Sequence, residues 1–158
     1  MPLSAGSLYS FDPYSVRSAT CGGLLPYFDL RQGTYDKEEA RAAIAEVREL
    51  RPYFAGDLYP LMPVTTSPTD WCAYQLDRPG EGDGVALVFR RHESPYPAID
   101  LQLRGVDEGA RYEWSLAADY AQPQWQAGSG RDLRSLRVFI DQRPGSVILR
   151  YRRQNAAG

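Results

Sequence analysis

The 158-residue chain has few of the side chains that enzymes and metal sites use most often. His92 is its only histidine, and its two cysteines, Cys21 and Cys72, form no CxxC pair. A Ser-His-Asp or Cys-His catalyst would therefore depend on His92, which stands in a turn segment typical of a surface loop. The same shortage disfavours a zinc or non-haem iron site. We expect no metal, no other cofactor, and reduced thiols rather than a disulfide.

The sequence also lacks a basic excess, a long apolar run and a phosphate loop. Its formal net charge is −2, which argues against a nucleic-acid partner. No apolar run approaches the ~20 residues that a membrane span needs. The first residues, MPLSAGSLYSFDPY, have neither the charged nor the apolar region of a signal peptide. We therefore expect a cytoplasmic protein that binds neither nucleic acid nor membrane.

What is present predicts a packed domain that begins with one strand-helix unit. Hydrophobic residues make up 43% of the chain, enough for a core. Alternation over Tyr14–Cys21 predicts a strand, which Gly22-Gly23 would end. An apolar loop, LLPYFDLRQGT, follows it, and a helix begins after Asp36, an N-cap residue that Glu39 can complete as a capping box.

The predicted helix over residues 36–51 is amphipathic. Its apolar stripe has i, i+4, i+7 spacing and consists of Ala40, Ile44, Val47 and Leu50. Pro52 disfavours its continuation. Residues 51–70 contain four prolines, Pro52 included, and show no period, which indicates an ordered linker. We divide the chain into a partial barrel unit (1–55), this linker (56–69) and a β-sandwich (70–154).

The rest of the chain reads as short antiparallel strands. Six runs alternate with turn signals: WCAYQLD, GVALVFRR, AIDLQLRG, RYEWSL, LRVFID and SVILRYRR. A further strand is expected near residues 124–127, with GSGRDL as a loop after it. This spacing predicts a mainly β fold, an antiparallel β-sandwich preceded by the strand-helix unit.

No catalytic constellation emerges from the residues themselves. A glycosidase needs two facing carboxylates, and nothing in the sequence brings Asp12, Asp29 or Asp57 to such a separation. Sugar-binding sandwiches stack pyranose rings on aromatic faces. Trp71 and Trp114 lie in alternating strands, where core burial is favoured, so Trp125 is the candidate for surface stacking.

Taken in order, several segments resemble one known family. They are YSVRSATCGGLLPYFDLR, RPYFAGDLYPL, TSPTDWCAYQLDR, GVALVFRRHESPY and LQLRGVDEGARYEW. The series is similar to the C-terminal end of the α-galactosidases of glycoside hydrolase family 36, over roughly residues 12–152. In that family a (β/α)₈ barrel carries the active site and a β-sandwich packs against it. The resemblance implies that the strand-helix unit is the last eighth of the barrel.

The resemblance also implies what this chain lacks. The two catalytic aspartates of that retaining family belong to earlier barrel strands, so we assign no catalytic residue here. The loop after the last barrel strand would line the barrel mouth, which makes Thr20, Cys21, Gly22 and Gly23 candidate substrate-binding residues beside Trp125. The implied partners are a galactoside, through the full enzyme, the missing barrel, and a possible second copy of the chain.

Three functions remain open at this point. The chain can be a non-catalytic C-terminal part that supports the barrel or an oligomer, a free-standing carbohydrate-binding sandwich, or a subunit that docks onto a separately encoded barrel. An orphan strand and helix would expose apolar surface. We therefore expect the isolated chain to self-associate unless residues 1–60 fold back onto the sandwich.

Overall fold

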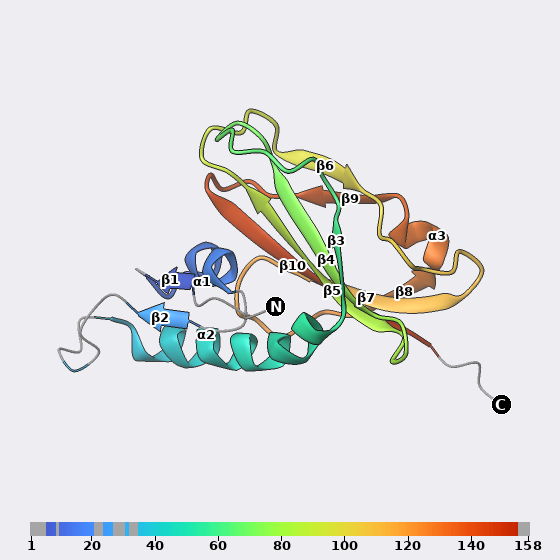
Figure 1. The fold of residues 1–158 in the computed structure, drawn as a ribbon, viewed down its shortest axis with the longest axis horizontal. Helices are drawn as coiled ribbons and strands as arrows, with labels where there is room; N and C mark the ends of the chain where they lie inside the picture. The colour runs from blue at the N-terminus through green and yellow to red at the C-terminus, as the bar shows by residue number, and fades with distance from the viewer. Residues whose placement is uncertain (1–5, 9, 21–23, 27–30, 32–34, 155–158) are drawn as a thin grey trace.

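The computed structural model describes residues 6–8, 10–20, 24–26, 31 and 35–154, and shows a mainly β chain (Figure 1). In chain order its elements are β1 (Gly6–Leu8), α1 (Pro13–Ala19), β2 (Leu24–Pro26), α2 (Lys37–Leu50), the 3₁₀ helix η2 (Arg51–Ala55), β3 (Asp57–Pro60), β4 (Cys72–Arg78), β5 (Asp83–Arg90), β6 (Ala98–Leu101), β7 (Arg111–Ala117), β8 (Gln126–Ser129), α3 (Gly130–Leu133), β9 (Leu136–Phe139) and β10 (Gly145–Arg153). The predicted fold class is confirmed.

The centre of the molecule is an antiparallel sheet of six strands in the order β3-β4-β5-β10-β7-β8. β6 and β9 form a separate antiparallel pair. All six predicted strand runs are confirmed as strands of these two sheets, and the expected strand near residues 124–127 is β8. β5 and β10 lie in the middle, where almost every side chain is buried on one face or the other.

The two faces of the six-stranded sheet pack against different layers. One face contacts the β6–β9 pair, with a core that includes Trp71, Val88, Val147, Leu101 and Val138. The other face contacts α1, α2 and η2, with a core that includes Leu87, Phe89, Ile148, Leu50 and Phe54. Because strand side chains alternate between faces, neighbours in β5 such as Leu87 and Val88 belong to different cores. The result is three layers, with the large sheet in the middle.

The predicted strand over Tyr14–Cys21 is wrong, because residues Pro13–Ala19 form the helix α1. Asp12 caps this helix by accepting a hydrogen bond from the Ser15 amide at 3.0 Å, and Pro13 occupies the first turn. The strand that precedes α2 is instead β2, within the segment predicted as a loop. β2 pairs in parallel with β1, and α1 is the crossover between them.

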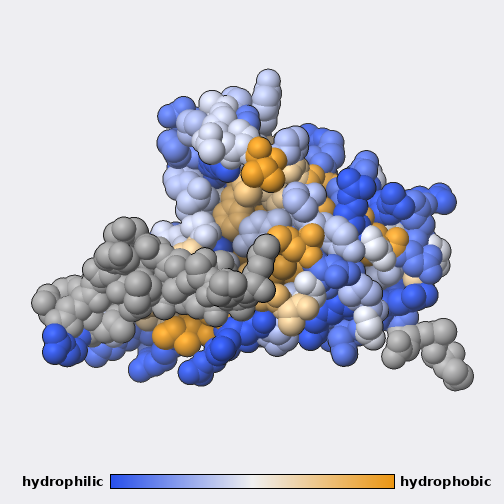
Figure 2. Space-filling view, viewed as in Figure 1, coloured by the Kyte–Doolittle hydropathy of each residue, from blue (hydrophilic) through white to orange (hydrophobic). Residues whose placement is uncertain are grey.

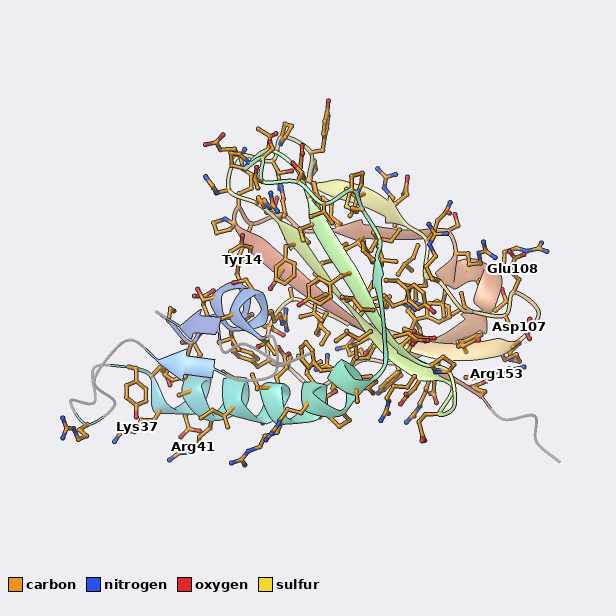
Figure 3. All side chains as sticks on the ribbon, in the orientation of Figure 1. Tyr14, Lys37, Arg41, Asp107, Glu108 and Arg153 are labelled. Atoms are coloured by element: carbon orange, nitrogen blue, oxygen red, sulfur yellow. The ribbon has the colours of Figure 1, made fainter. Side chains whose placement is uncertain are left out.

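The predicted helix is confirmed as α2, capped by Asp36, whose carboxylate accepts from the Glu38 and Glu39 amides at 2.8 and 3.1 Å. Its predicted apolar stripe is partly wrong. Ile44 is 43% exposed, whereas Ala43 and Glu46 are buried beside Ala40 and Leu50. Figure 3 shows Lys37 and Arg41 pointing away from the sheet, and Tyr14 of α1 pointing toward it. Tyr14 meets Phe89 edge-on, with ring centroids 5.8 Å apart.

Two segments predicted without regular structure contain elements. The proposed linker includes β3, the edge strand of the large sheet, which pairs with β4. GSGRDL, predicted as a loop, contains the end of β8 and the whole of α3, where the Ser129 hydroxyl and amide both donate to the Asp132 carboxylate. None of the helices in the described part of the chain is long and apolar enough to cross a membrane.

Candidate functional site

A buried ion network joins the helical layer to the sandwich. Arg17 of α1 is fully buried and donates two hydrogen bonds of 2.8 Å to the carboxylate of Glu46 on α2. Its remaining donors reach the carbonyls of Ala117, Ala118, Asp119 and Ser146 at 3.0–3.3 Å. A guanidinium is the side chain best suited to so many acceptors at once. The network therefore fixes both helices against the ends of β7 and β10.

Arg150 of β10 extends the same network. It donates to Glu49 at 2.6 and 3.0 Å and to Glu46 at 3.4 Å. Burial alone would lower the pKa of Arg150, but the bonds with Glu49 and Glu46 outweigh it and raise the pKa. The sequence carried one signal of this arrangement, since Glu46 falls on the apolar side of the helix, where a charge requires a buried partner.

An apolar groove of about 600 Å³ lies between the end of α1 and the neighbouring strands β3 and β4. Its lining includes Thr20, Leu58, Val64, Cys72, Tyr74 and Arg91. Leu58 and Val64 are strongly exposed, and Figure 2 shows apolar residues gathered around a hollow on this side of the molecule. We call this the β3 groove.

Of the candidate substrate-binding residues, the structure describes only Thr20 and Trp125, which lie toward opposite edges of the large sheet. Thr20 lines the β3 groove, but it is buried and its hydroxyl donates to the Val16 carbonyl at 2.6 Å. Cys21, Gly22 and Gly23 lie outside the described residues. Trp125 precedes β8, the opposite edge strand from β3, and is 41% exposed. The Arg152 guanidinium lies 4.7 Å from its ring centroid, so one face of the indole is already covered.

Of the carboxylates considered for catalysis, the structure describes Asp12 and Asp57. Asp12 caps α1, and Asp29 lies outside the described residues. Asp57 stands opposite Asp77 in the β3–β4 register. The Asp77 carboxyl is buried and accepts a hydrogen bond from the Tyr151 hydroxyl, and its desolvation raises its pKa. The Asp77 carboxyl therefore has its hydrogen-bond partner within the core.

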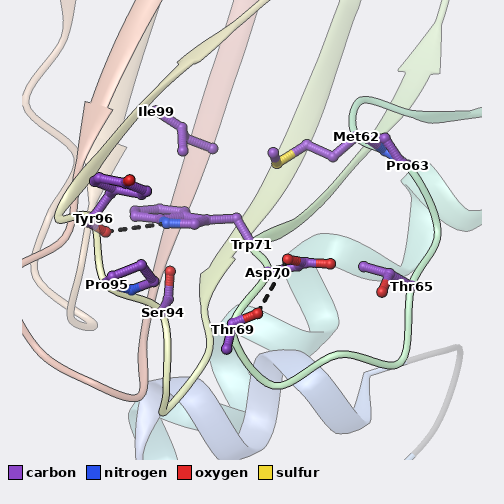
Figure 4. Close-up of a pocket in the computed structure, with 10 residues that line it drawn as sticks. All are labelled: Met62, Pro63, Thr65, Thr69, Asp70, Trp71, Ser94, Pro95, Tyr96 and Ile99. Atoms are coloured by element: carbon purple, nitrogen blue, oxygen red, sulfur yellow. Dashed lines mark hydrogen bonds between the residues drawn. The ribbon is translucent and has the colours of Figure 1, made fainter.

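A pocket that the sequence did not indicate lies at the end of the sandwich (Figure 4). It has a volume of about 540 Å³, and six of its lining residues are Met62, Asp70, Trp71, Ser94, Tyr96 and Ile99. Trp71 belongs to the core, as predicted, and only 5% of it is exposed. Its indole N–H donates to the Tyr96 carbonyl at 3.2 Å. We call this the Trp71 pocket.

Comparison with known proteins finds solved structures that share this fold. No protein-family model and no curated protein matches the chain. Solved structures of α-galactosidases do match. A family 36 enzyme variant from Geobacillus stearothermophilus, in complex with raffinose, matches with a TM-score of 0.65, 17% identity and 89% of this chain. The α-galactosidase from Lactobacillus brevis matches with a TM-score of 0.67, 13% identity and 91% of this chain.

A third match is the galactosidase domain of an α-galactosidase–sucrose kinase, with a TM-score of 0.66, 16% identity and 89% of this chain. The chain spans only 19–20% of the length of these three proteins. It therefore has the fold of about one fifth of an α-galactosidase. The family resemblance seen in the sequence is confirmed at the level of fold.

Proposed function

We propose that this chain is the C-terminal portion of an α-galactosidase-like glycoside hydrolase and is not catalytic by itself. The observation that carries the proposal is the match of nine-tenths of the chain to one fifth of several α-galactosidases. In this proposal β1–α1–β2–α2 corresponds to the end of a (β/α)₈ barrel, and the sandwich supports that barrel or a contact between copies. The missing barrel carries the two catalytic aspartates and binds the galactoside.

The parallel pair β1–β2 supports this correspondence. Parallel sheets occur with both faces covered and with several strands, and a pair of three-residue strands is too small to be stable alone. Further parallel strands beside β1 and β2 would complete such a sheet. The proposed domain boundaries, a cytoplasmic location and the absence of a nucleic-acid partner belong to the same proposal.

The test is hydrolysis of a nitrophenyl α-galactoside by the purified chain. We expect no turnover above buffer. Turnover that is abolished by Asp57→Asn or Asp12→Asn would refute the proposal, since it would place catalysis within these residues. The matched control is Asp100→Asn, because Asp100 is an exposed carboxylate on β6, in the layer on the other side of the large sheet from α1 and α2.

Two alternatives remain, and each has its own measurement. A free-standing carbohydrate-binding module would bind sugar at an exposed aromatic side chain, such as Trp125. A subunit of a split enzyme would gain activity when mixed with a separately expressed barrel. The DNA upstream of the first codon separates the second case from a continuous enzyme, because an in-frame barrel there would show one polypeptide.

A further inference from the structure

We propose that the Trp71 pocket binds the pyranose ring of a neutral saccharide. The proposal concerns a site away from the barrel segment and does not depend on hydrolysis. It differs from the alternative above in its location, since Trp125 takes no part.

The pocket has the size and lining of a small-molecule site. Its volume of about 540 Å³ falls within the range of about 300–1,000 Å³ that is typical of such sites. Its walls are mostly apolar, with Met62, Trp71 and Ile99 on one side, and a few polar groups at the rim. Sites of this kind combine apolar contact with a small number of placed hydrogen bonds.

The loops that frame the pocket are held in place by buried or half-buried arginines. The Arg91 guanidinium donates to the carbonyls of Thr65 and Ser67 at 2.8 and 2.6 Å. Arg90, on β5, donates to the Ser94 carbonyl at 3.1 Å and to two carbonyls after β9. The pocket is therefore formed before any ligand arrives, which lowers the entropic cost of binding.

Two aromatic side chains supply the apolar contact. The indole of Trp71 has its N–H bonded to the Tyr96 carbonyl, so its orientation is fixed. The Tyr96 side chain lies next to it and is 71% exposed (Figure 4). A pyranose ring presents a face of C–H groups, and that face packs on aromatic surfaces. Binding would cover the exposed ring of Tyr96.

The polar groups of the pocket favour a ligand with hydroxyls. Ser94 is fully buried, and its hydroxyl makes no hydrogen bond within the protein. Figure 4 shows this hydroxyl on the side of the pocket where Trp71 and Tyr96 lie. Asp70, at the rim, accepts one hydrogen bond from the Thr69 hydroxyl at 3.3 Å and is exposed.

A saccharide hydroxyl both donates and accepts, so it can pair with Ser94 and with the Asp70 carboxylate. Quaternary ammonium ions also bind aromatic pockets, but they have no hydrogen-bond donor or acceptor and would leave the Ser94 hydroxyl without a partner. The chemistry of the pocket therefore selects a sugar over an ammonium ion.

The test is an NMR titration of the purified chain that follows its three tryptophan indole N–H signals. The probes are methyl α-galactopyranoside, methyl α-glucopyranoside and raffinose, and tetramethylammonium chloride is the cationic comparison. We expect at least one saccharide to shift the Trp71 signal with a Kd in the millimolar range, or about 1 to 10 mM. The Trp125 and Trp114 signals should stay in place.

Two variants connect the shift to the pocket. Tyr96→Ala removes an exposed ring without disturbing the core, and it should weaken saccharide binding about 2- to 10-fold. Ser94→Ala removes a hydroxyl that the fold does not use, and should weaken binding by a similar factor with no loss of stability. Phe139→Ala is the matched control, because Phe139 is another exposed aromatic residue outside the pocket.

Several results would overturn the proposal: no Trp71 shift at about 50 mM saccharide, an equal shift with tetramethylammonium, or a shift that Tyr96→Ala leaves unchanged. A shift of the Trp125 signal alone would also overturn it and would place the sugar at that residue. Hydrolysis of the nitrophenyl galactoside, in contrast, would refute the proposed function and leave this site untouched.

Discussion

Replacing Arg17 with methionine should weaken the attachment between the helices and the sandwich. The methionine side chain fills much of the same volume but leaves the Glu46 carboxylate and several carbonyl groups without their donor. Breaking one side of a buried ion pair costs about 3–5 kcal/mol, because the remaining charge stays buried. Glu46 keeps a weaker contact to Arg150 at 3.4 Å. We therefore expect a loss of about 3 kcal/mol, the low end of that range.

Urea unfolding followed by circular dichroism measures this loss as a shift in midpoint at constant slope. The double variant Arg17→Met with Glu46→Leu removes both charges and should recover more than half of the loss, since an apolar pair replaces the ion pair. The control is Arg41→Met, which replaces an arginine of α2 that points away from the sheet. Arg41 pairs with Glu38 at the surface, where the side chains are 69% and 83% exposed, so its midpoint should not move.

The reasoning would be refuted by an Arg17→Met variant that loses less than about 1 kcal/mol, a value expected for an exposed pair. It would also be refuted by a double variant as unstable as the single one. In that case the carbonyl contacts, and not the buried charge of Glu46, would determine the stability.

Three further predictions follow from single contacts. Burial raises the pKa of Asp77 above its usual value of 3.8, so the folded protein keeps this proton to higher pH than the unfolded chain does. The wild type should therefore lose stability relative to Asp77→Asn as the pH rises from about 4 to about 7. Urea unfolding measures this difference in stability, and a difference that stays constant with pH would contradict the prediction. Gly56→Ala should cost about 1–3 kcal/mol, because its Cβ would lie 2.2 Å from the Asp77 carbonyl oxygen, whereas Gly80→Ala meets no atom within 4 Å and should leave the thermal midpoint unchanged. Asp36→Ala should cost about 1 kcal/mol in the same thermal assay through loss of the α2 cap, and an unchanged midpoint would show that the cap is not needed.

The strands were predictable because their sequences either alternate between apolar and polar residues or form continuous apolar runs between turn residues. β5 and β10 are buried on both faces, and their sequences GVALVF and GSVILRY show it. The segment Tyr14–Cys21 alternates as well, over only eight residues, and that length does not separate a strand from a helix. Asp12 followed by Pro13 is a helix-start pair, and was the local signal that favoured α1.

The sites were less predictable than the fold because they join distant positions. Arg17 and Glu46 are 29 residues apart, and Arg17 and Ser146 are 129 apart, so no local pattern connects them. The burial of Trp71 was predicted correctly from its strand. Its partner Tyr96 stands in a proline-containing turn whose path depends on the arginines that bind the neighbouring loops.

The burial of the central sheet on both sides limits how the chain can be shortened. A truncated protein starting at Trp71 would retain β4 to β10, yet Leu87, Phe89 and Ile148 would face water instead of Leu50 and Phe54. This truncated protein should aggregate during expression unless polar residues replace these three exposed apolar side chains. Recombinant work on the sandwich therefore needs to retain residues from Asp12 onward.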